Sequence, residues 1–186
     1  SMKTLCSILG TIVGVVIAGV FASVFGAMSN INGFNVEDIE TLIYIGQNSK
    51  LDISGLLFSG ILIASLGAVI DTAMSIATTI EEIKYRRPDI SAKELLKSGI
   101  KIGGDMMGTM SNTLILAFTG GSLSTLVVFY AYDMSFLQMF NSYSIGIEII
   151  QGISGSLGVI LTVPFVSIIS AFLMTRKKMS LSNELK

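Results

Sequence analysis

The sequence predicts an all-α membrane protein that crosses the bilayer four times. Hydrophobic residues make up 51% of its 186 residues, charged residues make up only 13%, and the mean hydropathy is +0.75. A soluble domain carries about 25% charged residues, so this composition indicates a lipid environment. Four apolar segments reach about 20 residues or more, the length at which a helix crosses the hydrocarbon. They span about residues 5–28, 53–80, 106–132 and 147–174 of a single membrane domain, 1–186.

The distribution of basic residues predicts the orientation. Four crossings place both termini on one side of the membrane. Eleven of the twelve Lys and Arg residues precede the first segment, lie between the second and third, or follow the fourth, and Lys50 is the exception. Because Lys and Arg collect in short cytoplasmic segments, we expect an N-in, C-in protein.

The first apolar segment carries a small residue at every fourth position, which makes one face of its helix smooth. A neighbouring backbone can approach such a face closely, so we expect helix packing there. A cleaved signal peptide is the weaker interpretation, because the apolar run exceeds the about 7–15 residues of a signal sequence. The predicted packing face consists of Gly10, Gly14, Ala18, Ala22 and Gly26.

Two connections between the segments carry signals for short helices. After the first segment, Asn35 can cap a helix whose apolar residues have helical spacing. Between the second and third segments, Ser91–Glu94 matches the Ser-x-x-Glu capping box. Apolar residues interspersed with lysines follow it and predict a short amphipathic helix at the cytoplasmic interface. A solvated basic loop is the alternative, and the two are compatible.

Helix breakers fall inside the third and fourth segments. Gly120 and Gly121 lie well inside the third segment, and predict either two half-helices at a substrate site or a close-packing point. Pro164 lacks a backbone donor and crowds the preceding turn, so it predicts a kink in the fourth helix near mid-membrane.

Polar residues inside the second segment form one stripe. Asp71, Ser75 and Thr78 are spaced four and three residues apart and share one face of a helix. Asp71 lies ten residues from Glu81, about 15 Å below the cytoplasmic surface and close to mid-membrane. A carboxylate at this depth costs at least about 2.5 kcal/mol, so it needs protein or water around it, or must hold its proton.

The third segment enters from the same side with a second polar stripe. Counting from Asp105 places Asn112 about 10 Å deep, level with Ser75 and one turn from Asp71. We therefore expect the two stripes to face each other. The predicted polar site consists of Asp71, Ser75, Thr78, Asp105, Thr109, Asn112 and Thr113.

Two functions fit this polar site. A protonatable aspartate among hydroxyls and amides suits a transporter or channel component that moves a small ion, proton or solute past Asp71 and Asn112. The alternative is a structural or assembly subunit whose polar residues only clasp helices. An intramembrane aspartyl hydrolase is a minor alternative, because Ile102 interrupts the Gly-x-Gly-Asp pattern and the two carboxyls lie at different depths.

Several other classes lack support in the sequence. The chain has no histidine, Cys6 is its only cysteine, and its 12 basic and 13 acidic residues nearly cancel. We therefore expect no metal, cofactor or nucleic-acid partner. Phosphate-binding loops and nucleophile elbows are also missing, so we expect no enzymatic activity.

The polar stripes carry a resemblance to a known family. Three stretches are similar to the YibE/F-like family of bacterial multi-pass membrane proteins: "LLFSGILIASLGAVIDTAMSIATTIEEI", "ELLKSGIKIGGDMMGTMSNTLILAFTGGSL" and "GSLGVILTVPF". The resemblance extends from Gly33 to Phe165 and implies a transport component of the bacterial cell membrane. The resemblance does not assign a function to any residue of this chain.

Members of this family are often larger, with further spans upstream, so the chain resembles their membrane-embedded C-terminal half. The small-residue face and the polar stripe also leave more interface than one four-helix bundle buries easily. In the lipid bilayer we therefore expect a homo-oligomer, or a complex with a separate N-terminal half.

Overall fold

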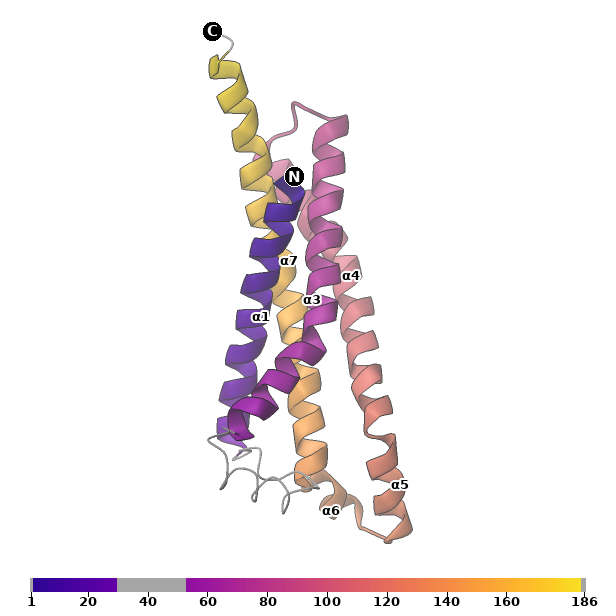
Figure 1. Cartoon of the computed structure of the whole chain (residues 1–186). Coiled ribbons are helices and arrows are strands. Elements are labelled where there is room, and N and C mark those ends of the chain that lie inside the picture. Colours follow the sequence, from indigo (N-terminus) through magenta and orange to yellow (C-terminus); the bar gives the residue numbers. More distant parts are fainter. Residues whose placement is uncertain (1, 30–52, 185–186) are drawn as a thin grey trace.

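The chain forms a long bundle of helices (Figure 1). The computed structural model describes residues 2–29 and 53–184. This part contains helices and turns but no strand, which confirms the all-α prediction for it. The helices are α1 (Met2–Met28), α3 (Ile53–Arg86), α4 (Ala92–Gly121), α5 (Leu123–Ala131), α6 (Phe136–Phe140) and α7 (Tyr143–Glu184).

The long helices have the length and composition of membrane spans. α1, α3 and α7 each contain an apolar stretch long enough to cross a bilayer. α4 and α5 pass the same test only together, and they are bent by 44° at the break between them. The described residues therefore hold three candidate spans, or four when the bent pair counts as one. The prediction of a helical membrane protein is confirmed, whereas its orientation in the membrane stays a prediction.

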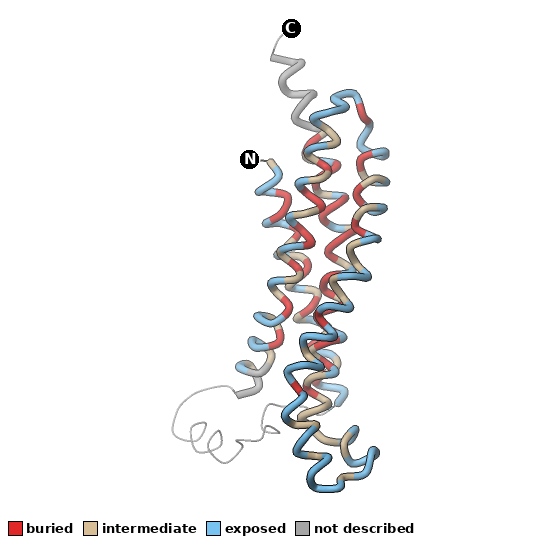
Figure 2. Tube along the Cα trace, turned by 90° about the vertical axis from the view of Figure 1, so that its right-hand side faces the viewer, coloured by how far each residue is buried: buried red, intermediate tan, exposed pale blue. Residues whose placement is uncertain are grey.

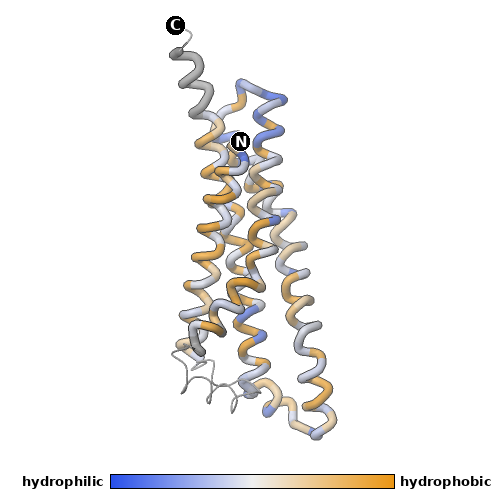
Figure 3. Tube along the Cα trace, in the orientation of Figure 1, coloured by the Kyte–Doolittle hydropathy of each residue, from blue (hydrophilic) through white to orange (hydrophobic). Residues whose placement is uncertain are grey.

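Most charged residues of the described chain gather where α1 begins, α3 ends and α4 begins (Figures 1 and 3). We call this the basic end, after Lys84, Arg86, Arg87 and Lys93 in and around the turn between α3 and α4. The Lys3 ammonium lies 3.5 Å from a carboxylate oxygen of Glu81 at this end. The other end of the bundle, where α1 ends and α5 and α6 lie, is the opposite end.

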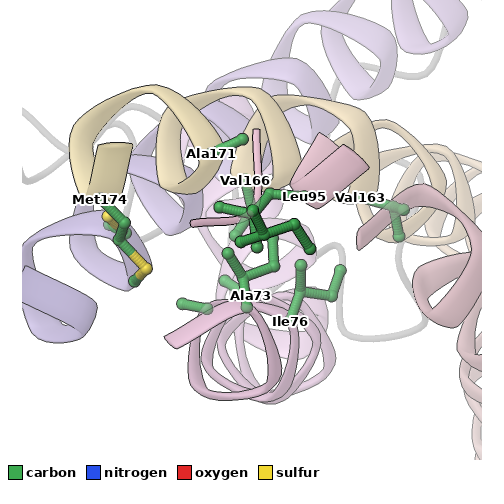
Figure 4. Close-up of a cluster of buried hydrophobic side chains, with 11 residues drawn as sticks. Ala73, Ile76, Leu95, Val163, Val166, Ala171 and Met174 are labelled. Carbon is green, nitrogen blue, oxygen red and sulfur yellow. The ribbon is translucent and has the colours of Figure 1, made fainter. Parts of the chain in front are cut away.

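α7 is the central helix of the bundle and packs against α1, α3 and α4 (Figures 1 and 2). Half of its most apolar window is buried, more than in the other single-helix spans. Its inward residues join those of the other helices in a core near the basic end (Figure 4). The residues labelled there are Ala73, Ile76, Leu95, Val163, Val166, Ala171 and Met174.

The small residues of α1 form the buried face of that helix. A side-chain carbon added at Gly14 would lie 2.7 Å from Val69 Cγ1, and closer still to the hydroxyl of Thr162. One added at Gly10 would overlap Val166. α1 therefore lies so close to α3 and α7 that only small residues fit between them. The buried residues of this face include Gly10, Gly14, Ala18, Ala22 and Gly26.

The capping box lies at the start of α4. The Glu94 backbone N–H donates to Ser91 Oγ at 3.3 Å, and the Ser91 N–H donates to Glu94 Oε2 at 3.3 Å. The helix then continues without interruption into the third apolar segment. A separate interfacial helix is therefore not confirmed, because the residues predicted to form it are the first part of the continuous helix α4. The helix predicted at Asn35 lies outside the described residues.

The predicted helix breakers behave differently from each other. α4 ends at Gly121 and α5 begins at Leu123. This break lies toward the opposite end of the bundle (Figure 1). At Pro164, α7 continues as one helix. The kink expected at this proline stays a prediction.

Candidate membrane-embedded polar site

Asp71 lies near the middle of the bundle's height. Gly14, next to the midpoint of α1, faces Val69 of α3. Asp71 follows two residues later, which is about 3 Å along the helix axis. If α1 spans the membrane, the carboxyl group of Asp71 is therefore attached at the depth of the hydrocarbon centre.

The side chain of Asp71 points away from the bundle. Val69 and Ala73, two residues before and after it, are both fully buried. Because successive residues of a helix are rotated by about 100°, Asp71 lies on the side of α3 opposite to both. It is exposed, and in the described part of the chain it has no hydrogen-bond or ion-pair partner.

The packing of α3 against α4 defines which residues share a height. A side-chain carbon added at Gly103 of α4 would lie 3.1 Å from Ile76 Cδ1 of α3. The two helices are antiparallel, so moving five residues from this contact along each brings Asp71 level with Gly108. Leu114 of α4 and Ser65 of α3 both lie beside Gly155 of α7, so they share a height. Each lies six residues beyond the level of Asp71 and Gly108, which agrees with this register.

This register corrects the predicted height of Asn112. Asn112 lies level with Gly67, about 6 Å beyond Asp71 toward the opposite end, whereas Ser75 lies level with Gly104. The predicted depth of Asn112 takes Asp105 as the point where the third helix enters the membrane. α4 begins much earlier, at Ala92, so its residues lie further along the bundle than expected.

The polar residues of α4 also point outward. Asp105, Thr109, Asn112 and Thr113 are exposed, while Gly103 is buried. The Thr113 hydroxyl donates to the Thr109 carbonyl of its own helix at 2.8 Å. In the described chain no hydrogen bond joins Asp71 to Ser75 or to Asn112, so the structure does not bring the two stripes together as a clasp within one chain.

The predicted polar residues instead lie on the outer side of neighbouring helices α3 and α4. Ser75 is half-buried and the other six are exposed. Outward glycines lie between them. We call this surface the α3–α4 outer face; it comprises Gly60, Ala64, Gly67, Asp71, Met74, Ser75, Thr78 and Glu82 of α3, with Lys97, Lys101, Gly104, Asp105, Gly108, Thr109, Asn112, Thr113, Ile115 and Leu116 of α4.

A separate cavity of about 360 Å³ lies near the opposite end, between the α4–α5 break, α6 and the start of α7. Apolar side chains form most of its wall, and Thr119, Ser122 and Glu148 are its polar members. The two hydroxyls donate to carbonyls of their own helix, Thr119 to Ile115 at 2.9 Å and Ser122 to Phe118 at 2.9 Å. None of the seven predicted polar residues lines this cavity.

Glu148 was not singled out from the sequence, although a signal was present. It is an acidic residue inside the fourth apolar segment, where ionisable residues are rare. In the structure it is half-buried against the cavity. It lies only five residues from the start of α7, however, and therefore near the end of the span rather than at its centre.

The long apolar helices are those of an α-helical integral membrane protein. The chain belongs to the YibE/F-like protein family, whose sequence profile matches residues 1–176. The match is longer than the resemblance from Gly33 to Phe165. That the chain corresponds to the C-terminal half of larger members stays a prediction. No curated protein and no solved structure matches the chain.

Proposed function

We propose that this chain is a component of a membrane transport system that moves a small ion, proton or solute along the α3–α4 outer face, past Asp71 and Asn112. One observation carries the proposal: Asp71 is exposed at mid-height, with no partner in the described chain. A charged aspartate facing lipid there costs about 2.5–3.5 kcal/mol on insertion scales, and such residues usually mark ion or substrate pathways.

Polar groups continue along the height of the face. Asp105 lies level with Met74, and Asp71 follows about 4.5 Å further along, level with Gly108. Asn112 comes after another turn. Carboxylate, hydroxyl and amide oxygens at such short intervals suit the stepwise passage of a cation or proton, because each step needs an acceptor within reach.

A structural or assembly subunit is the second candidate. It is favoured by the outward glycines of the face, since a side-chain carbon added at Gly60, Gly67, Gly104 or Gly108 would touch nothing within 4 Å. Small residues on an outer face suit close contact with another chain. In this case the polar groups would bind that chain and transport nothing.

We propose no enzymatic activity. An aspartyl dyad requires two carboxyls close enough to share a proton. Asp71 and Asp105 are not hydrogen-bonded to each other in the described chain, and their levels differ by about 4.5 Å along the helix axes. The family match names no reaction.

Flux measurements in proteoliposomes test the transport proposal. Wild-type protein should conduct protons or a small cation above the level of empty liposomes, and Asp71→Asn should lower the flux to that level, because the amide keeps the shape but cannot ionise. Asp133→Asn is the matched control, since Asp133 lies in the turn after α5. Wild-type flux equal to that of empty liposomes would overturn the proposal, and unchanged flux in Asp71→Asn would remove Asp71 from the pathway.

We also propose that the basic end faces the cytoplasm of a bacterial cell, in line with the distribution of Lys and Arg. In a Cys6→Ala background, an impermeant thiol reagent added to intact cells should label Tyr132→Cys. It should label Asp89→Cys only after permeabilisation. The reverse labelling pattern would contradict this orientation.

A further inference from the structure

The α3–α4 outer face cannot be an ordinary lipid-facing surface. Asp71, Asp105 and Asn112 are exposed at heights where a bilayer offers neither water nor donors. Thr109 and Thr113 add hydroxyl groups to the same face. These groups require hydrogen-bond partners. At this depth the partners have to come from protein or from water that protein retains.

The shape of the face fits a close helix contact. On α3, Gly60, Ala64, Gly67 and Asp71 follow one another at intervals of four, three and four residues, which places them on one side of the helix. On α4, Gly104, Gly108 and Asn112 recur every fourth residue. None of the four glycines has a neighbour within 4 Å of an added side-chain carbon.

Polar residues and glycines alternate between the two helices at matching heights. Asp71 of α3 lies level with Gly108 of α4, and Asn112 of α4 lies level with Gly67 of α3. The same register places Ser75 level with Gly104. Each of these larger polar residues thus has a glycine at its own height on the other helix.

We propose that the α3–α4 outer face packs against the same face of a second copy, related by a two-fold axis perpendicular to the membrane. Such an axis leaves every residue at its own depth and brings α3 of one copy against α4 of the other. Asp71 then lies over Gly108 of the partner subunit and accepts hydrogen bonds from Thr109 or Asn112 of the partner subunit. The inference rests on the proposed function, since it assigns the partner that completes the same site.

Charges on the face favour a second copy over an unrelated chain. Near the basic end, Glu82 of α3 lies level with Lys97 of α4, and Thr78 lies level with Lys101. Lys97 and Lys101 are exposed, with no ion pair in the described chain. Glu82 forms an ion pair with Arg86 of its own helix at 2.6 Å. A two-fold axis brings Lys97 of the partner subunit to the height of this pair, and Asp71 to the height of hydroxyl and amide groups of the partner subunit. Asp105 meets the hydroxyl donors of Ser75 and Thr78 within about one turn.

Disulfide crosslinking between two differently tagged copies tests the interface in lipid. In a Cys6→Ala background, one copy carries Ala64→Cys and the other carries Ile115→Cys, because these residues lie at the same height on α3 and α4. A disulfide forms only when the Cα atoms approach within about 7 Å. We expect oxidation to yield a covalent heterodimer, which contacts within one copy cannot produce.

Two control pairs define the specificity of the crosslink. Ala64→Cys with Lys101→Cys combines two exposed positions of the face whose heights differ by about 21 Å. Val16→Cys with Ile115→Cys combines α4 with the outward side of α1. Both pairs should stay at background. Absence of the matched crosslink, or equal crosslinking of the controls, would overturn the inference and leave a different protein or lipid as the cover.

Dimer dissociation measured in lipid gives a second readout. Asp71→Leu removes an acceptor from each of two symmetry-related contacts, so the Kd of the dimer should rise about 10- to 100-fold. An unchanged Kd would contradict the assigned contact. If the matched pair crosslinks but the protein shows no flux, the dimer interface is supported and the transport proposal is wrong. If the protein shows flux but the matched pair does not crosslink, the transport proposal is supported and the dimer interface is wrong.

Discussion

α1 and the α3–α4 pair present different surfaces at the same heights. Between Leu5 and Val20, every exposed residue of α1 is Leu, Ile or Val. Over the corresponding part of α3, Ile63 and Met74 are the only large apolar residues among the exposed ones, and the rest are small or polar. α4 adds an exposed carboxylate, Asp105, and two outward glycines, together with the exposed apolar residues Ile115 and Leu116.

The difference indicates what covers each surface. Branched apolar side chains pack well against lipid tails and need no partner. Glycines leave recesses that lipid fills poorly, and a carboxylate finds no donor in the hydrocarbon. The outer side of α1 therefore has the composition of a lipid-facing surface, whereas the α3–α4 outer face has the chemistry of a protein contact or a hydrated path.

A carboxylate placed on the outer side of α1 should destabilise the protein strongly. Val16→Asp puts an aspartate two residues from the Gly14–Val69 contact, as Asp71 is on α3. We expect it to lower the free energy of unfolding by about 2.5–3.5 kcal/mol, because no polar group covers it. Thermal unfolding in lipid nanodiscs measures this, with Val16→Leu as the control. A Val16→Asp protein as stable as the wild type would remove the distinction between the two surfaces.

Two neighbouring glycines of α4 lie on different sides of the helix, one buried and one exposed. A side-chain carbon at Gly103 would overlap Val163, whereas one at Gly104 would touch nothing within 4 Å. Gly103→Leu should lower the free energy of unfolding by about 1–3 kcal/mol through overpacking. Gly104→Leu should leave the folding of the single chain unchanged and act only on association. Equal destabilisation in chemical or thermal unfolding would show that Gly104 does not face outward.

The capping box at the start of α4 should make a smaller contribution to stability. Ser91→Ala removes the side-chain acceptor of the capping box and should cost about 0.5–2 kcal/mol of stability. Lys93→Ala, in the same exposed turn, is the control. Thermal unfolding compares the two variants. Equal stability of both would mean that the hydrogen bonds between Ser91 and Glu94 contribute nothing.

Local patterns in the sequence predicted much of the fold. Apolar length located the spans, and the Ser91–Glu94 motif located a helix start. Spacing of four residues identified the face of α1 that the structure buries. The predicted polar residues are present on two adjacent helices, but their direction and relative height were not predictable, because each depends on how α3 and α4 pack against α7.

The height of Asn112 and the cavity at Glu148 are two features that the sequence patterns did not predict. Asn112 was placed too near the basic end, because helix α4 continues into polar sequence where hydropathy alone suggested a break. The cavity beside Glu148 is formed by residues of the α4–α5 break, α6 and the start of α7, which are far apart in the sequence. Neither result follows from spacing within one segment.

The lipid environment, the helices and their periodic faces follow from the sequence, because hydrocarbon requires continuous apolar helices and because side chains repeat with the turn of a helix. The tertiary structure alone decided that α7 occupies the centre and that the carboxylate of Asp71 points outward. A helix with one small-residue side and one polar side can bury either, and the packing of its neighbours selects which side is left for a partner.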